Sequence, residues 1–281
     1  MVLRVIVLRR LGAVVASAAG STGDTVCARL GLMTDSQPAT EATLSSTADL
    51  ADLVIVVAGA GGAAGPPLVR RLARAGATVV ALDASKSRLD EVVADARAAS
   101  GSDRVEGRVV DLLDPTATTQ LAADVHRRYG RVDGLAHLVG GWRGGVHLTE
   151  EPLEDWYWLH DLLVRTLLHT SRAFHDALRA SPRGRLVLIS TVQAQAPVAT
   201  NAMYAAAKAA AEAWTLAVAD SFAGTDAAAV ILPITALLTP AMREAEPGEA
   251  FSGFTEVADL ADTIHDLWLK PASDLNGLRL S

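Results

Sequence analysis

Cysteine is almost absent from this sequence, which has one, Cys27, among its 281 residues. A single cysteine cannot form an internal disulfide, and the sequence has no CxxC or paired Cys/His spacing of the kind that binds metals. So little cysteine is typical of proteins from reducing compartments. We therefore expect a cytoplasmic protein that binds no metal.

Two further absences exclude classes of partner. The sequence has no surplus of basic residues, since 25 Lys and Arg stand against 32 Asp and Glu, for a net charge of −7. A protein that binds nucleic acid needs a positively charged surface for the phosphates. No apolar run reaches the roughly 18 residues that a membrane-spanning helix requires. We expect neither nucleic acid nor a membrane as a partner.

The hydrophobic residues, by contrast, are abundant and regularly placed. They make up 50% of the chain, which is enough for a large core. From residue 52 onward, short apolar runs rich in Val, Ile and Leu alternate with longer segments rich in Ala. Continuous apolar runs are typical of parallel strands, because helices cover both faces of a parallel sheet.

This alternation predicts the order of the elements along the chain. Strands are expected at 53–58, 77–82, 105–110, 134–139, 185–190, 227–232 and 278–280, and helices at 64–75, 85–99, 115–129, 153–178, 202–222 and 256–269. Strands that alternate with helices form βαβ units. Residues 52–281 are therefore expected to form a single doubly wound α/β domain with a parallel sheet of about seven strands.

A glycine-rich turn, residues 59–65, joins the first expected strand to the first expected helix. Glycine there lets the backbone approach a pyrophosphate, while the helix directs its N-terminus at the charge. Glycine is also common in turns that bind no ligand, but its place between strand and helix favours nucleotide binding. The expected cofactor contacts in this Rossmann-type turn are Gly59, Gly61, Gly62, Ala64 and Gly65.

Acidic residues end the next two expected strands. Asp83 can accept hydrogen bonds from the ribose hydroxyls of a dinucleotide and would repel a 2′-phosphate, or it could cap the next helix. Asp111 and Leu112 follow the third strand, where an adenine would lie. The acid favours NAD(H), and NADP(H) is the alternative because Lys86 and Arg88 lie close to Asp83 in the sequence.

The most specific local pattern is Tyr204 followed four residues later by Lys208. This spacing places both side chains on one face of a helix. An ammonium group near a phenol lowers the pKa of the phenol, so the tyrosine can exchange a proton with a substrate while hydride moves. The alternative is a chance pair on a solvated helix.

In this order, the motifs resemble the short-chain dehydrogenase/reductase family over residues 52–281. The glycine motif of the family, TGxxxGxG, is similar to residues 58–65, with Ala58 and Ala63 as departures. Tyr204 and Lys208 match its YxxxK pair, and Thr191, 13 residues before Tyr204, takes the place of its serine. The resemblance implies an NAD(P)-dependent oxidoreductase that transfers a hydride to or from a small carbonyl, alcohol or conjugated-ring substrate.

Two departures from the family pattern put the complete proton relay of the family in doubt for this chain. The NNAG motif is replaced by residues 137–140, which begin with His137, and the usual helix asparagine is Leu163. These changes motivate a second hypothesis, a cofactor-binding regulatory or sensor protein with little catalytic activity.

A narrower resemblance concerns the segment that begins Gly140, Gly141 and Trp142. It is similar to the GGWAGG stretch of dihydropteridine reductases, and residues 233–243, including Pro233 and Thr235, are similar to a second stretch of those NADH-linked enzymes. Trp142 could stack on a flat substrate ring or pack over the cofactor. Residues 233–253 have few structural signals and are expected to form a lid or a surface loop.

The family resemblance also implies a homodimer or homotetramer through the helices expected at 153–178 and 202–222. Residues 1–51 lie outside the alternating pattern. Arg4, Arg9 and Arg10 precede a short apolar stretch that weakly resembles a secretory or transit peptide. We favour a poorly ordered extension, or a start codon placed too early with Met33 as a second start, because a nicotinamide enzyme finds its cofactor inside the cell.

Overall fold

The computed structural model describes residues 50–280. Most of the extension predicted at 1–51 therefore lies outside the described residues, and that prediction stays untested. Within the described part, Leu50 is fully buried in the core, and its amide donates to the carbonyl oxygen of Ala75 at 3.0 Å.

One parallel six-stranded sheet forms the centre of the domain, in the order β3-β2-β1-β4-β5-β6. Its strands are β1 (Val54–Ala58), β2 (Thr78–Asp83), β3 (Val105–Val109), β4 (Gly134–His137), β5 (Arg185–Thr191) and β6 (Ala228–Ile234). The order reverses between β1 and β4, as the doubly wound prediction requires. A ligand crevice in such sheets lies at this reversal, outside the carboxyl ends of the strands.

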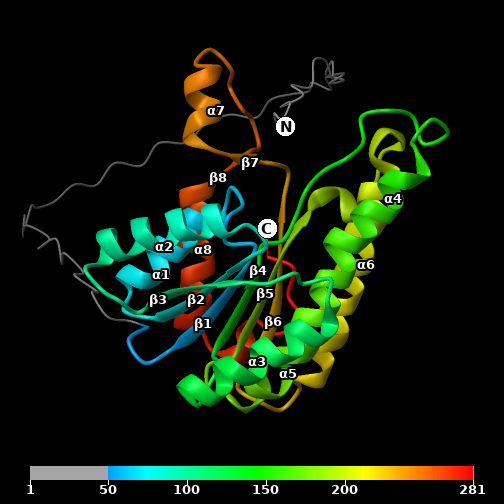
Figure 1. Ribbon diagram of the computed structural model, residues 1–281. Helices are drawn as coiled ribbons and strands as arrows, with labels where there is room; N and C mark the ends of the chain where they lie inside the picture. The colour runs from blue at the N-terminus through cyan, green and yellow to red at the C-terminus, as the bar shows by residue number, and fades with distance from the viewer. Residues whose placement is uncertain (1–49, 281) are drawn as a thin grey trace, which may run out of the picture. The chain divides into compact units, whose positions relative to one another are not determined.

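Helices cover both faces of the sheet (Figure 1). One face carries α1 (Gly65–Arg74), α2 (Lys86–Ser100) and α8 (Val257–Asp266), and the other carries α3 (Pro115–Tyr129), α4 (Leu153–His160), α5 (Thr166–Ala180) and α6 (Ala202–Ser221). Short 3₁₀ turns occur at Val192–Ala194, Ala199–Asn201, Leu267–Leu269 and Ala272–Asp274.

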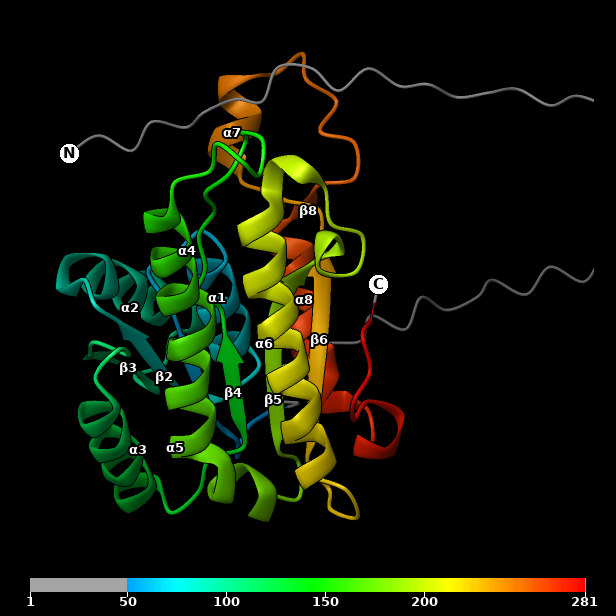
Figure 2. The same ribbon diagram turned by 90° about the vertical axis from the view of Figure 1, so that its right-hand side faces the viewer.

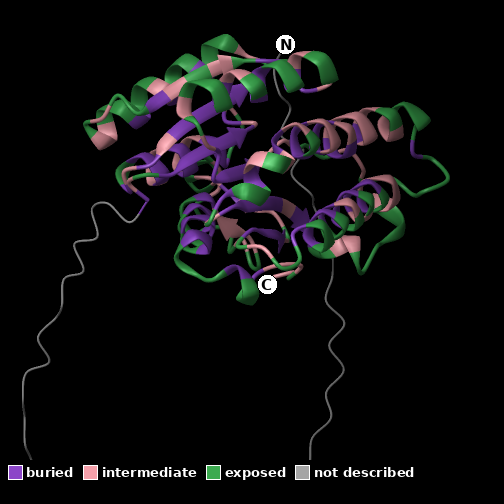
Figure 3. Cartoon of the chain, turned by 90° about the horizontal axis from the view of Figure 1, so that it is seen from below, coloured by how far each residue is buried: buried purple, intermediate pink, exposed green. Residues whose placement is uncertain are grey.

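The core lies in two layers, one on each side of the sheet. Successive residues of β1 alternate between them, because side chains of a strand point to opposite faces. Ile55 and Val57 pack in the layer that contains Trp268, whereas Val56 packs with Phe174 and Phe222. Figure 3 shows the buried residues concentrated in the sheet and on the inward faces of the helices.

The seventh expected strand is reduced to a single bridge. Arg279 pairs in parallel with Ile231 of β6, and the amide of Leu280 donates to the carbonyl oxygen of Ile231 at 2.9 Å. Gly277, at φ 80°, turns the chain onto the edge of the sheet immediately before this pair. Among the described residues, no further bridge joins this segment to β6.

One predicted helix and one predicted loop segment differ in detail from the prediction. The helix expected at 153–178 is interrupted between α4 and α5 by one π-helical turn, Asp161–Arg165. Residues 233–253 are not structureless, because they contain β7 (Leu237–Leu238) and α7 (Pro240–Ala245), and β7 pairs in parallel with β8 (Thr255–Glu256). Figures 1 and 2 show α7 at the same end of the domain as the loop that follows β4.

Candidate active site

Three of the predicted catalytic residues lie where β5 ends and α6 begins. Thr191 is the last residue of β5, Tyr204 lies in the first turn of α6, and Lys208 lies one turn further along. Thr191 and Lys208 are buried, with 2% and 6% of their surface exposed, and Tyr204 is half-buried. The structure therefore brings together a hydroxyl, a phenol and an ammonium group at the carboxyl end of the sheet.

The lysine is held in place by the strand. Its Nζ donates a hydrogen bond of 2.8 Å to the carbonyl oxygen of Ile189. From there Nζ lies 6.0 Å from the centre of the Tyr204 ring. The two side chains share one helix face, as the four-residue spacing predicted.

Burial dominates the acid–base properties of this pair. Desolvation raises the pKa of Tyr204 to about 12, against a smaller lowering by a hydrogen bond with the Thr191 side chain. Desolvation also lowers the pKa of Lys208 to about 8, although the negative charge of Glu212 raises it. The sequence argument, which considered the lysine charge alone, predicted a lowered tyrosine pKa and omitted the cost of burying a phenolate.

The glycine-rich turn is closely packed at both ends. Gly59 has φ 80°, and a Cβ there would lie 2.8 Å from the amide nitrogen of Val139. A Cβ on Gly65 would overlap the carbonyl oxygen of Ala60. Both positions therefore need glycine for close backbone approach, the feature predicted for a nucleotide-binding turn.

Some amide groups in this turn make hydrogen bonds within the protein and others do not. The amides of residues 59–62 and of Gly65 donate to protein oxygens, whereas those of Ala63 and Ala64 donate to no protein group among the described residues. Pro66 and Pro67 carry no amide proton. The turn thus offers two backbone donors at the start of α1, which fits the phosphate of a dinucleotide.

Asp83 ends β2 beside this turn, and 7% of its surface is exposed. Its Oδ2 accepts from the Gly61 amide at 2.9 Å, and its Oδ1 accepts from the Ser85 amide at 2.8 Å and from Arg88 Nη2 at 3.0 Å. Burial raises the pKa of Asp83, but these hydrogen bonds and the Arg88 charge together lower it below its ordinary value. The carboxylate is therefore charged, and it anchors the glycine turn.

Asp111 and Leu112 follow β3 at the same end of the sheet. Asp111 is exposed, and its Oδ1 accepts from the amide of Leu113 at 2.9 Å. Leu112 is buried, and its carbonyl oxygen lies 2.8 Å from Nδ1 of His169. Asp114 caps α3 through the amides of its first turn, so Asp111 is not needed as the helix cap.

The loop after β4 contains Gly140, Gly141 and Trp142, all exposed. Trp142 is 38% exposed, and its Nε1 donates to Oδ1 of Asn201 at 3.2 Å. The Gly145 amide donates to the carbonyl oxygen of Thr200 at 2.7 Å. These contacts tie the loop to the segment directly before Tyr204, so Trp142 lies beside the start of α6.

Pro233 and Thr235 lie at the end of β6. Pro233 is buried opposite Ser190, Ile234 pairs with Thr191, and Thr235 is exposed one residue beyond. The register places the start of the 233–253 segment beside Thr191. This position suits residues that contact a nicotinamide or a substrate.

The two departures from the family motif lie behind the lysine. His137 is fully buried, with Nδ1 3.1 Å from Thr170 Oγ1 and Nε2 3.3 Å from Thr166 Oγ1. Desolvation and the Lys208 charge lower the pKa of His137 to about 3, so it is neutral. Leu163 is buried in the π-helical turn. The asparagine amides of the family are thus replaced by an imidazole, two hydroxyls and an apolar side chain.

Two residues near the site were not predicted from the sequence. Glu212, which is buried, and Arg279, which is partly buried, form an ion pair of 3.2 Å beside Thr191 and Lys208. Glu212 lies four residues after Lys208 on α6, so helical spacing could have indicated it. Arg279 lies 67 residues further on, and only the tertiary fold brings it there.

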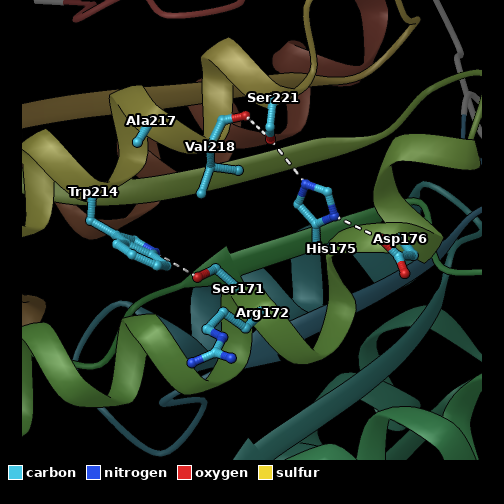
Figure 4. A pocket seen from close by; sticks show the side chains of 8 residues that line it. All are labelled: Ser171, Arg172, His175, Asp176, Trp214, Ala217, Val218 and Ser221. Carbon is cyan, nitrogen blue, oxygen red and sulfur yellow. Dashed lines mark hydrogen bonds and ion pairs between the residues drawn. The ribbon is translucent and has the colours of Figure 1, made fainter.

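A hollow of about 360 Å³ lies elsewhere, between α5 and α6. Figure 4 shows its lining residues, Ser171, Arg172, His175, Asp176, Trp214, Ala217, Val218 and Ser221. Trp214 Nε1 donates to Ser171 Oγ at 2.8 Å, and His175 Nε2 lies 2.9 Å from Ser221 Oγ. None of the predicted catalytic residues lines it, so this hollow is not the candidate active site.

Within residues 50–280, no cluster of three or more His, Cys, Asp or Glu side chains could hold a metal ion. In the same part of the chain, no helix has both the length and the apolar character needed to cross a membrane.

Comparison with protein families agrees with this geometry. The family described as short chain dehydrogenase matches residues 53–250, which is well over half of the chain. The chain therefore belongs to the short-chain dehydrogenase family, a class of NAD(P)-dependent oxidoreductases.

Characterised relatives carry dehydrogenase names. The chain is 35% identical over 155 residues to 1-deoxy-11-beta-hydroxypentalenate dehydrogenase of Streptomyces avermitilis, across 54% of this chain and 57% of that enzyme. It is 27% identical over 158 residues to 2,3-dihydro-2,3-dihydroxybenzoate dehydrogenase of Bacillus subtilis, across 56% and 59% of the two chains. The match thus spans less than two thirds of these enzymes. Their names favour an oxidoreductase over the regulatory or sensor alternative.

Solved structures share the fold. An NAD⁺-bound xylitol dehydrogenase is 19% identical with a TM-score of 0.70, over 82% of this chain and 96% of that chain. A Shigella flexneri 2a structure in complex with NADP is 24% identical with a TM-score of 0.72, over 83% and 98%. The neighbours include both cofactors, so the likeness does not decide between NAD and NADP.

Proposed function

We propose that this chain transfers a hydride between a nicotinamide cofactor and a carbonyl, alcohol or conjugated-ring carbon of a small molecule. The observation that carries the proposal is the grouping of Thr191, Tyr204 and Lys208 at the carboxyl end of β5, in the same sheet whose β1 leads into the glycine turn. When bound, the cofactor supplies or accepts the hydride.

Each of the three residues has a defined task in this reaction. In the reducing direction, Tyr204 Oη gives its proton to the substrate oxygen as the carbon receives the hydride, and in the oxidising direction the phenolate takes that proton back. The buried phenol has a pKa of about 12, so a phenolate needs nearby positive charge. Lys208 supplies such a charge, and the Thr191 hydroxyl orients the substrate oxygen.

For the cofactor we propose NAD(H). Gly59 and Gly65 allow the close backbone approach, and the amides of Ala63 and Ala64 are available to a pyrophosphate. The charged carboxylate of Asp83 beside the turn favours ribose hydroxyls and repels a 2′-phosphate. Arg88 forms an ion pair with Asp83, and its side chain is 59% exposed. It is the group that could bind the 2′-phosphate of NADP(H).

For the substrate we propose a molecule with a flat ring that stacks on Trp142. The indole is partly exposed, and its hydrogen bond to Asn201 fixes it near the start of α6. Aromatic stacking of this kind contributes roughly 0.5–1.5 kcal/mol of free energy beyond that gained by burying apolar surface.

We further propose a cytoplasmic homodimer or homotetramer that pairs through α5 and α6. On α6, Ala206, Ala210, Ala213 and Ala217 are exposed at helical spacing, and small residues let two helices approach closely. The hollow between α5 and α6 continues this face (Figure 4).

The test of the reaction is the Tyr204→Phe variant, which removes the proton donor and keeps the ring. Turnover of a substrate found with a panel of ring ketones and quinonoid compounds should fall about 100-fold or more, the usual scale of general acid–base catalysis. The affinity for NADH, measured by fluorescence titration, should change little.

Tyr129→Phe is the matched control, because Tyr129 ends α3 away from the glycine turn and β5. It should keep full turnover. Full turnover by Tyr204→Phe would refute the proposed role of the tyrosine, and NADH binding by the unaltered protein without turnover of any panel compound would favour the sensor alternative.

A further inference from the structure

A buried carboxylate lies one helical turn beyond the catalytic lysine. Glu212 is 7% exposed, and its Oε1 accepts a hydrogen bond of 2.5 Å from Ser190 Oγ. Arg279 Nε lies 3.3 Å from Oε1 and 3.2 Å from Oε2 of the same carboxylate. Burying a carboxylate is costly unless it is paired and hydrogen-bonded, and here both conditions are met.

Arg279 has a second contact, on the catalytic strand. Its Nη2 donates to the carbonyl oxygen of Thr191 at 2.8 Å. The backbone of Arg279 is fixed by its bridge to Ile231, because the amides of Ile231 and Leu280 donate across that pair at 3.0 and 2.9 Å. The guanidinium thus joins the last β segment, α6 and the end of β5.

Together these contacts fix three successive residues at the end of β5. Lys208 Nζ binds the carbonyl oxygen of Ile189, Glu212 binds the hydroxyl of Ser190, and Arg279 binds the carbonyl oxygen of Thr191. Thr191 is therefore held through its own backbone and through its two predecessors. A shift of the Thr191 backbone, from which its hydroxyl projects, would require at least one of these bonds to break.

The Glu212 carboxylate also affects the charge of Lys208. Tyr204 and Glu212 face Lys208 from α6, His137 faces it from β4, and Arg279 lies behind Glu212. His137 is neutral, since its pKa is about 3. Glu212 opposes the desolvation that lowers the pKa of Lys208, so among these described groups it favours the charged ammonium.

We propose that Glu212 and Arg279 are positioning residues that hold the Thr191 hydroxyl in place and give the buried Lys208 ammonium its counter-charge. This inference rests on the roles of Thr191 and Lys208 in the proposed function. It assigns a task in catalysis to the β segment at residues 279–280, which lies outside the elements that carry the other site residues.

Glu212→Gln tests the charge, because it keeps the shape and one acceptor for Ser190. Lys208 acts as an ammonium, which is present below its pKa of about 8 and lost as the pH rises through that value. Without Glu212 the loss should begin at lower pH. We expect kcat to fall about fivefold at pH 8 and less than about twofold at pH 6, because a displacement of one pH unit lowers the charged fraction at pH 8 from about a half to about a tenth.

Arg279→Met and Arg279→Lys test the positioning. The methionine variant loses both contacts, so kcat should fall about tenfold while KM for NADH changes less than about twofold, on the scale of one lost charged hydrogen bond. Arg279→Lys keeps a positive charge beside Glu212 but lacks the planar guanidinium that contacts Glu212 and Thr191 together. It should recover the pH profile of the unaltered protein and only part of kcat.

Asp95→Asn and Arg70→Met are matched controls, since Asp95 and Arg70 form an exposed ion pair between α2 and α1. Neither should alter kcat or the pH profile. Equal loss at every pH in Glu212→Gln would overturn the inference, and so would unchanged kcat in Arg279→Met. If Glu212→Gln does not fold, a displaced pH profile of kcat in Arg279→Lys would overturn the inference.

Failure of the proposed function would look different. In that case Tyr204→Phe keeps its turnover, whatever the Glu212 and Arg279 variants do. An inactive Tyr204→Phe together with an unmoved pH profile in Glu212→Gln would refute only the positioning role.

Discussion

At the scale of single residues, burial has more effect on the site than the sequence motif suggests. Tyr204 and Lys208 are spaced for interaction, yet desolvation raises the pKa of the phenol to about 12 and lowers that of the lysine to about 8. Both changes disfavour the charged forms. The polar groups around them, above all Thr191 and Glu212, partly oppose these changes.

Asp83 carries a prediction at this scale. Asp83→Asn removes the negative charge and keeps one acceptor oxygen, which can serve either the amide of Gly61 or that of Ser85. We expect the Kd for NADH to rise about tenfold, on the scale of a lost charged hydrogen bond, and the Kd for NADPH to fall relative to it, because the repulsion of the 2′-phosphate is gone.

Fluorescence titration with both cofactors measures this preference. Asp95→Asn serves as the control, because Asp95 binds only the exposed Arg70 among the described ion pairs. Tighter binding of NADPH than of NADH by the unaltered protein would contradict the proposed preference for NAD(H).

At the scale of elements, the turn between β1 and α1 depends on close packing. Gly65 begins α1 directly against the carbonyl group of Ala60, so no side chain fits there. The same packing places the amides of Ala63 and Ala64 at the helix start. The packing of the turn therefore also fixes the position of the two amides that are proposed to bind the cofactor.

Gly65→Ala should consequently damage both stability and cofactor binding. Overpacking of this kind costs about 1–3 kcal/mol in the free energy of unfolding, which urea denaturation measures, and the Kd for NADH should rise at least about tenfold. Gly248→Ala is the control, since nothing lies within 4 Å of a Cβ at Gly248. Unchanged NADH affinity in a folded Gly65→Ala variant would show that the turn does not bind the cofactor.

At the scale of the whole molecule, the two faces of the sheet have different surroundings. The face with α1, α2 and α8 closes over its core, whereas α5 and α6 on the other face leave a hollow and a row of exposed alanines. Leu216 on α6 is also 47% exposed. A second copy of the chain would cover these groups.

Ala213→Glu tests this assembly, because it places a charge in the middle of the row on α6. Sedimentation velocity at micromolar concentration should show a dimer or tetramer for the unaltered chain and monomer for the variant, since an unpaired charge is costly to bury. Ala98→Glu, on the exposed side of α2, should leave assembly unchanged. A purely monomeric unaltered chain would contradict the proposal.

The sequence by itself determined the fold class and indicated the candidate site residues, because both depend on local patterns. The apolar runs predicted all six strands of the sheet, and the glycine turn, Asp83 and the Tyr204–Lys208 spacing are readable over a few residues each. The π-helical turn at 161–165, the short β7, α7 and β8, and the reduction of the seventh strand to a bridge depend on packing and were not predicted.

Only the tertiary structure decided what surrounds those residues. It joined Arg279 to Glu212 and Thr191 across 67 and 88 positions, and it enclosed His137 between two threonines of α5. Desolvation and contacts between distant segments arise only when the chain is folded, so no local pattern contains them. The motif therefore indicates the candidate reacting groups, while the fold sets their charge and their position.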